Sequence, residues 1–191
     1  MTKKSIIITI VVLIIGLIIF YISTFNKKMS KDEFIELMKS FKNVSNAKIE
    51  SSIETKYIKG DNSVSIRKDG VLTWVNSKDK KCISWSPENR TYSNLEYVED
   101  ITGLEDAEYN FCGFENLNGT KCAVAEFKLS DVNLITKIWL DTKNGAVLKT
   151  VNKGKNELNE EYEITEEYTV TYNVVNDSDV EKPSLEGYTK V

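Results

Sequence analysis

The sequence predicts a mainly β (α+β) chain: an N-terminal transmembrane helix, then a curved antiparallel sheet or unclosed β-barrel packed on one or two helices. Three observations lead to this prediction. Residues 5–22 form an uncharged apolar run, and one amphipathic segment follows it. Most of the remaining chain consists of short segments that alternate apolar and polar residues between turn signals, a pattern typical of half-buried strands.

The first 29 residues differ from the rest of the chain and form a separate segment. Residues 5–22 are long enough, at about 1.5 Å per residue, to cross the roughly 30 Å hydrocarbon core of a bilayer. The run ends in Phe20-Tyr21-Ile22-Ser23, without the small residues of a signal-peptidase site, and the first cysteine is only at position 82. We therefore expect residues 1–29 to be an uncleaved anchor and residues 30–191 to form one extracytoplasmic β-rich domain.

The orientation of this anchor does not follow from charge alone, because lysines flank both sides of the apolar run. A short basic tail before an apolar stretch nevertheless drives export, and long following domains translocate largely regardless of charge. The expected location is therefore the cell membrane, with a single pass and the C-terminal domain outside the cytoplasm. The many Lys, Ile and Asn residues, with few Arg and Pro, are typical of a bacterium with an AT-rich genome.

One amphipathic helix is predicted from Ser30 to about Asn43. Ser30 and Glu33 have the spacing of a capping box. Apolar residues then recur at helical spacing: Phe34, Ile35, Met38 and Phe41. Because charges of both signs occupy the rest of the segment, we expect its apolar stripe to pack on a sheet rather than on a membrane.

The alternating segments that follow are interpreted as a meander of strands. They lie at residues 47–57, 64–66, 71–75, 81–85, 90–92, 109–114, 120–129, 133–140 and 146–151. A short helix is predicted over residues 95–104, where apolar residues change to helical spacing. The tail from Ser184 onward is expected to fold back after Pro183 ends regular pairing.

The longest alternating segment is EYEITEEYTVTYNVV, residues 161–175. A straight strand of that length would extend roughly 48 Å, so we expect it to bend or divide near Glu166 and Glu167. Glu166 interrupts the apolar row. It is interpreted as an exposed edge or bulge carboxylate, and the alternative is that it points into a cavity and orients a ligand.

The three cysteines leave two interpretations open. Cys112 and Cys122 bracket a segment that resembles a hairpin turn, so they form a disulfide if they face each other across paired strands. The alternative is three buried thiols. No C-x-x-C motif and no histidine occur, so neither a metal site nor a cofactor is expected.

Enzymatic activity and nucleic-acid binding are not expected, and no catalytic residue is proposed. Without histidine the commonest general base is absent, and no P-loop, G-x-S-x-G or H-E-x-x-H motif occurs. The net charge is −4, and lysines are interleaved with acids instead of forming the basic stripe that nucleic acids require.

The order of helix, meander, short helix and second meander ends in a distinctive hairpin and a terminal strand with a Pro-containing tail. The hairpin reads Ile138-Trp-Leu-Asp141-x-Lys143-x-Gly145. Over residues 30–191 this arrangement resembles the lipoprotein-carrier (Lol-type) superfamily. The resemblance implies an unclosed β-barrel with helices on its concave face, and a lipid or a lipoprotein as partner.

The sequence differs from the periplasmic carriers of that superfamily in two ways. It keeps a membrane anchor, and it has no evident lipid-handling arginine, since Arg67 and Arg90 are its only arginines. An anchored relative would still hold a lipid or a lipidated partner without shuttling it.

Two functional hypotheses follow. The first is a membrane-anchored binding domain whose curved sheet encloses an apolar pocket for a lipid or a lipidated protein. The expected lining residues are Phe34, Met38, Trp74, Trp85, Trp139, Tyr168, Val170 and Tyr172. The second is a surface sensor or protein-interaction module, in which the same residues form a filled core and partners dock outside. A cavity of roughly 300 Å³ or more would favour the first hypothesis.

Overall fold

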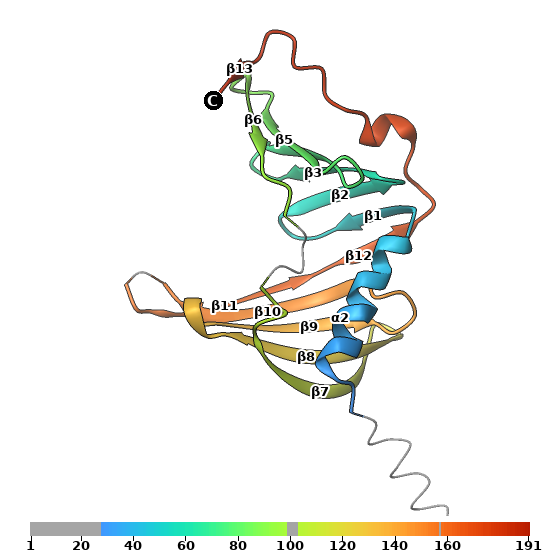
Figure 1. Ribbon diagram of the computed structural model, residues 1–191, viewed down its shortest axis with the longest axis vertical. Coiled ribbons are helices and arrows are strands. Elements are labelled where there is room, and N and C mark those ends of the chain that lie inside the picture. Colours follow the sequence, from blue (N-terminus) through green and yellow to red (C-terminus); the bar gives the residue numbers. More distant parts are fainter. Residues whose placement is uncertain (1–27, 99–102, 157) are drawn as a thin grey trace, which may run out of the picture. The chain divides into compact units, whose positions relative to one another are not determined.

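The strands form two curved sheets in the computed structural model, which describes residues 28–98, 103–156 and 158–191 (Figure 1). The eight-stranded sheet has the order β12 (Thr169–Tyr172), β1 (Asn46–Glu50), β2 (Glu54–Lys59), β3 (Asn62–Arg67), β4 (Leu72–Asn76), β5 (Lys81–Ser86), β6 (Thr91–Leu95) and β13 (Thr189–Lys190). The five-stranded sheet has the order β11 (Glu161–Glu167), β10 (Val147–Lys155), β9 (Leu134–Asp141), β8 (Thr120–Leu129) and β7 (Glu108–Leu117). The predicted mainly β fold with an unclosed, curved sheet is confirmed.

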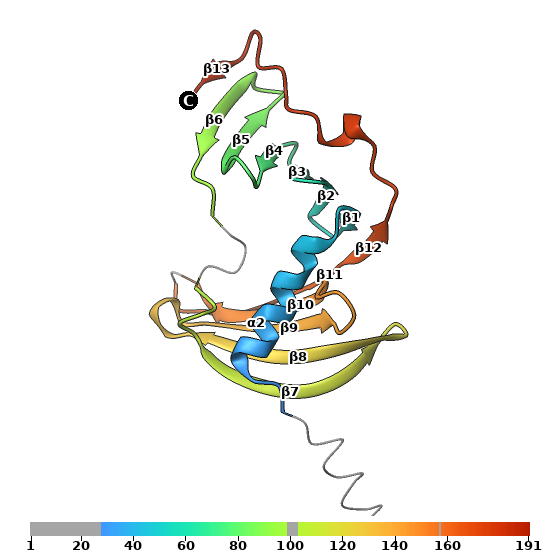
Figure 2. The ribbon, with the colours of Figure 1, turned by 45° about the vertical axis from the view of Figure 1, so that its right-hand side comes forward.

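One α-helix, α2 (Lys31–Ser40), precedes the strands and continues as the 3-10 turn η1 (Phe41–Asn43), as the sequence predicts. Its buried residues are Phe34 and Ile35. Figure 2 shows α2 lying across the concave side of the five-stranded sheet. Two further 3-10 turns, η2 (Ser130–Val132) and η3 (Asp177–Val180), complete the helical elements of the described residues.

The predicted anchor cannot be compared with the structure, because residues 1–27 lie outside the described residues. Among residues 28–98, 103–156 and 158–191, none of the helices combines the length and the apolar composition that a membrane span needs.

The two faces of the five-stranded sheet carry different side chains, because directly opposed residues in a ladder share a face. The register sets Phe127 opposite Thr136, Thr136 opposite Asn152, and Asn152 opposite Ile164. This row lies on the concave face, which α2 partly covers. The convex face holds a separate buried cluster: Cys122, Val124, Trp139 and Val151, with Leu117 and Leu148 packed against it.

The eight-stranded sheet has its own core, which the C-terminal tail completes. Val64, Trp74 and Ile83 are buried together, and Leu185 of the tail packs on them. The indole N–H of Trp74 donates to the carbonyl oxygen of Val180 at 3.1 Å. Beyond this contact β13 pairs with β6 in parallel, which confirms that the tail folds back.

The single strand predicted over residues 47–57 is wrong, because the chain turns between β1 and β2. The Ser51 hydroxyl oxygen accepts from the backbone N–H of Ile53 at 3.3 Å and of Glu54 at 3.2 Å, and so stabilises the turn. Ile53 extended the alternation in the sequence, but its side chain is 55% exposed at the turn. The apolar pattern therefore ran across a hairpin.

Two other predicted boundaries differ in detail. The last long segment divides, as expected, but at Tyr168 between β11 and β12 rather than at Glu166. The short helix predicted over residues 95–104 falls partly on residues 99–102, outside the described residues, while Leu95 is the last residue of β6.

Candidate functional site

The concave face of the five-stranded sheet is half covered and half open. In the covered half, Phe34 of α2 contacts Tyr109 of β7 and Phe127 of β8, with ring centroids 6.0 Å and 5.6 Å away. Tyr109 and Phe127 also meet edge to face at 5.3 Å. Phe34 and Phe127 are completely buried. A single aromatic side chain of the helix therefore fills this half of the face.

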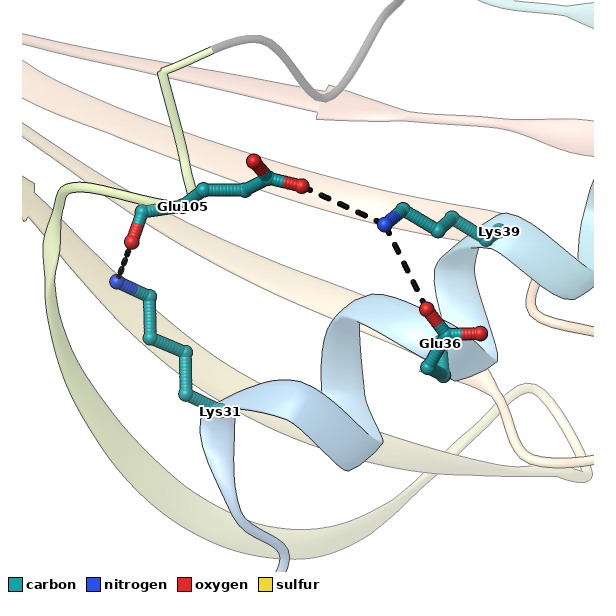
Figure 3. A network of polar contacts seen from close by, with 4 residues as sticks. All are labelled: Lys31, Glu36, Lys39 and Glu105. Carbon is teal, nitrogen blue, oxygen red and sulfur yellow. Dashed lines mark hydrogen bonds and ion pairs between the residues drawn. The ribbon is translucent and has the colours of Figure 1, made fainter.

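Polar contacts hold α2 to the loop before β7 (Figure 3). The Lys31 ammonium donates to the carbonyl oxygens of Glu105 and, at 2.7 Å, of Ala107. The Lys39 ammonium forms ion pairs with Glu105 at 3.4 Å and with Glu36 at 3.5 Å. The hydrogen bond to Glu105 raises the pKa of Lys39, although desolvation opposes the shift. Because such surface pairs contribute little, the packing of Phe34 dominates the docking of the helix.

The hairpin that joins β9 to β10 also touches the helix. The Asp141 carboxylate accepts from the backbone N–H of Lys143 at 2.9 Å, and the backbone N–H of Gly145 donates to the Asp141 carbonyl at 2.9 Å. Gly145 has a φ of +74°, and a Cβ placed there would lie 1.8 Å from the Leu37 carbonyl oxygen. Only glycine allows both this turn and the close approach of α2.

The open half of the concave face lies over β10 and β11. Ile164 is 52% exposed and Tyr162 is 38% exposed, although the register places both on the same face as Phe127. The Tyr162 ring lies against the backbone of Gly154, where an added Cβ would be 2.8 Å from the phenol oxygen. This half therefore presents apolar side chains to solvent beside the polar pair Thr136 and Asn152, which hydrogen bond at 2.8 Å.

Glu166 interrupts the apolar row of this strand, but it has a partner. The Tyr168 hydroxyl donates to the Glu166 carboxylate at 2.6 Å and lies 3.5 Å from the Thr150 hydroxyl. Burial, assisted by the hydrogen bond to Glu166, raises the pKa of Tyr168 to about 12. Glu166 is thus half-buried on the concave face, where it fixes Tyr168, and differs from the exposed carboxylate expected from the sequence.

Two hollows border this region, and charged residues line most of each. One of about 290 Å³ lies between α2 and the loop before β7, lined by Asp32, Ile35, Glu36, Lys39 and Glu105. The other, of about 420 Å³, lies at the ends of β9, β10 and β11, lined by Asn133, Ile135, Lys153, Gly154, Lys155, Glu161, Tyr162 and Glu163. Neither is lined by a residue of the apolar pocket that the sequence predicts.

The residues expected to line that pocket are distributed over several places. Phe34 fills the covered half, and Met38 is half-buried on the same helix. Trp74 and Trp85 belong to the core of the eight-stranded sheet. Tyr168, Val170 and Tyr172 follow one another along β12 and the residue before it, and the Tyr172 hydroxyl accepts from the Asn144 amide at 2.7 Å.

Trp139 lies on the convex face, away from Phe34. Its indole N–H donates to the Glu115 carboxylate at 2.8 Å, and the ammonium groups of Lys137 and Lys149 lie 4.7 Å and 5.6 Å from the ring centroid. Strand alternation is the reason, because Ile138 and Leu140 face the concave side and the residue between them must face the other.

The sequence leaves two interpretations of the cysteines open, and in the structure all three are free thiols, without a disulfide between Cys112 and Cys122. Cys122 is opposite Glu115, and Cys112 sits at a bulge between Phe111 and Gly113. Cys112 precedes Glu115 by three residues, which corresponds to about 10 Å along the strand. The two cysteines are therefore farther apart than the Cα separation of a disulfide allows. Desolvation raises the pKa of both thiols, although the Cys112 side chain is exposed and the Cys122 side chain is buried. Within residues 28–98, 103–156 and 158–191, no group of three or more Cys, Asp or Glu side chains is arranged to hold a metal.

No family model and no curated protein sequence matches this chain. An uncharacterized conserved protein from Thermus thermophilus is similar in structure, with a TM-score of 0.59 and 8% identity over 85% of this chain and 99% of that chain. A LolA superfamily protein from Nitrosomonas europaea has a TM-score of 0.33 and 12% identity, over 78% of this chain and 97% of that one. The MucA/MucB complex of Pseudomonas aeruginosa includes a chain with a TM-score of 0.41 and 11% identity, over 80% of this chain and 61% of that one. The last two scores are too low to support an argument, so the comparisons show a fold shared with the Thermus thermophilus protein.

Proposed function

We propose that this chain is a membrane-anchored, extracytoplasmic binding domain that holds a lipid or a lipidated partner on the concave face of its five-stranded sheet, without catalysing a reaction. One observation carries the proposal: the open half of that face exposes Ile164 and Tyr162 on the strand whose other face carries carboxylates. Exposed apolar side chains that gather on one face are typical of binding surfaces.

The surroundings of the open half support an elongated apolar ligand. The concave parity continues from Ile164 to Tyr168, Val170 and Tyr172 across the junction of the two sheets, and the one carboxylate in this row, Glu166, is held by the Tyr168 hydroxyl. On the convex face, Lys149 and Lys153 pair with the glutamates of β11 and keep that side polar. A lipid chain would therefore lie on the concave side only.

The proposed location rests on the sequence. Residues 5–22 have the length and composition of a single membrane span, and the long domain that follows is expected to be exported. Anchoring of this kind would keep the domain where lipids and lipidated proteins are abundant.

A second candidate function is a protein-interaction module with a filled core. The complete burial of Phe34 and the charged lining of both hollows favour it, because a packed face leaves no enclosed apolar volume for a ligand. The two candidates differ in whether Ile164 touches a ligand.

Native mass spectrometry of a fragment spanning residues 28–191, mixed with a fatty acid or a phospholipid, distinguishes them. Wild-type protein is expected to retain one lipid, and Ile164→Glu to lose at least tenfold in affinity, since an apolar contact worth roughly 1.5–3 kcal/mol is replaced by a charge. The matched control is Thr165→Glu, which adds the same charge on the convex face. Circular dichroism must show that all three proteins are folded. If the wild type retains no lipid, or if both variants lose lipid affinity equally, lipid binding is refuted and the protein-interaction module is the function that remains.

A further inference from the structure

Strand β11 has one edge without a partner. It is the last strand of the five-stranded sheet and pairs only with β10, so its other edge meets no strand among residues 28–98, 103–156 and 158–191. The strand is seven residues long, enough to accept a further strand along its length. Natural sheets usually cover or interrupt such edges, because their unpaired backbone groups are a template for pairing.

The backbone groups that point away from β10 can be identified. The N–H of Tyr168 donates to the Leu148 carbonyl of β10 at 2.9 Å. Since N–H and C=O groups of an antiparallel strand alternate in direction, the even-numbered residues face β10. The groups of Glu161, Glu163, Thr165 and Glu167 therefore face the open edge, which we define by these four residues.

The open edge of β11 continues along the chain into the edge of β12 that pairs with β1. Further along the same segment, the N–H of Asn173 donates to the Asn46 carbonyl at 3.1 Å, where β12 pairs with β1. Asn173 has the same parity as Thr165, so both face the same side of the strand. An added strand on β11 would continue the line of β1.

The side chains beside the open edge are acidic on one face and apolar on the other. On the convex face, Glu163 pairs with Lys153 at 2.8 Å and Glu167 with Lys149 at 3.0 Å. These carboxylates stay 54% and 58% exposed, so a second cation can approach each of them. On the concave face Ile164 is exposed.

We propose that an extended peptide with alternating basic and apolar residues binds this chain by adding a strand to the open edge of β11. Its lysine or arginine side chains would lie opposite Glu163 and Glu167, and its apolar side chains would lie beside Ile164. Strand β10 shows how such a partner fits, because it places Lys149, Lys153 and Lys155 opposite three glutamates of β11. This mode of recognition takes affinity from backbone hydrogen bonds and specificity from alternate side chains.

The same charges disfavour a second copy of the chain as the partner. Two β11 strands paired through their open edges would set glutamates against glutamates, and like charges directly opposite each other destabilise a ladder. Strand addition to the open edge does not require a bound lipid, although the peptide and a lipid would both contact Ile164.

Fluorescence anisotropy tests this strand addition by measuring the binding of a labelled peptide to the full chain in phosphatidylcholine nanodiscs. The probe is a labelled, acetylated and amidated peptide of alternating Lys and Val, seven residues long. We expect saturable binding that weakens with added salt. A peptide with N-methylated lysine amides keeps every charge but loses the edge hydrogen bonds, so its affinity should fall at least tenfold. A Glu-Val peptide should not bind, and empty nanodiscs correct for adsorption.

The matched variants are Thr165→Pro and Thr165→Val. Proline removes the outward N–H without touching the ladder to β10, a position where edge strands tolerate it, so peptide affinity should fall at least tenfold. Valine keeps the N–H and should bind within twofold of the wild type. If Thr165→Pro does not fold, the double variant Glu163→Gln, Glu167→Gln replaces it, with an expected loss of at least threefold at low salt. No binding of the Lys-Val peptide, or equal binding of its N-methylated form, overturns the proposal.

Discussion

Replacing Phe34 with alanine tests how α2 is held on the sheet. The side chain is completely buried and packs on two aromatic rings, Tyr109 and Phe127. Phenylalanine-to-alanine changes at such sites cost about 3–5 kcal/mol. The exposed ion pairs of Lys39 contribute at most about 1 kcal/mol and cannot compensate. We therefore expect a loss of about 3–5 kcal/mol, which lowers the Tm by roughly 6–20 °C in a chain of this size.

Urea unfolding followed by circular dichroism, together with calorimetry, measures this loss. The matched control is Phe114→Ala. Phe114 is also an aromatic residue of the sheet, but it is 40% exposed, and its ring contacts the Phe111 ring at 5.3 Å and the Lys121 ammonium at 4.7 Å. Its loss should be about 1 kcal/mol. A loss below about 1 kcal/mol for Phe34→Ala would refute the conclusion that this side chain fills the covered half of the concave face.

Three further predictions concern other parts of the molecule. Gly145→Ala should lower the free energy of unfolding in urea by more than about 2 kcal/mol, since it adds a clash with α2 to the strain of a left-handed backbone. The control Gly70→Ala, at a φ of +82° with open space around it, should lower that free energy by only about 1–2 kcal/mol. Alkaline titration at 295 nm should contain components near pH 12 from both Tyr109 and Tyr168, and Tyr168→Phe should remove only the second. Because the folded state holds the Tyr168 proton more tightly, its stabilising contribution is present below about pH 10 and is lost as the pH rises to about 12. Ellman's reagent should modify the exposed Cys112 in the native protein and the buried Cys122 only after unfolding, and dithiothreitol should not change the Tm; a drop in Tm on reduction would mean that a disulfide exists in solution.

Local patterns in the sequence predicted several of the elements well. The helix predicted over residues 30–43 matches α2 together with η1. The strand predicted over residues 120–129 matches β8. In the helix, apolar residues recur with the helical period, whereas β8 contains a continuous apolar run at residues 122–125 that is buried on both faces. The strand over residues 47–57 failed because a serine hydroxyl, rather than Gly or Pro, makes the turn at Ser51.

The candidate site was harder to predict, because it depends on which strands become neighbours. Strand alternation places Ile138 and Trp139 on opposite faces of the sheet, but only the register decides that Ile138 shares its face with Phe127 and that Trp139 does not. Likewise, a bulge at Cys112 shifts the ladder so that Cys122 meets Glu115. The exposure of Ile164 follows from the missing partner strand on β11, and no local pattern of residues encodes a missing neighbour.

The pairing of β12 with β1 has a consequence for the order in which the chain folds during synthesis. Strands β7 to β11 are joined by successive hairpins, so each can pair as soon as it leaves the ribosome. Strand β1 can pair with β2 early, but its other edge must wait for Thr169–Tyr172, and the indole of Trp74 must wait for the Val180 carbonyl. Because contacts between distant residues form slowly, the eight-stranded sheet should be completed last, and a released chain truncated before residue 169 would keep the hairpins of both sheets but lack the strand that pairs with the outer edge of β1.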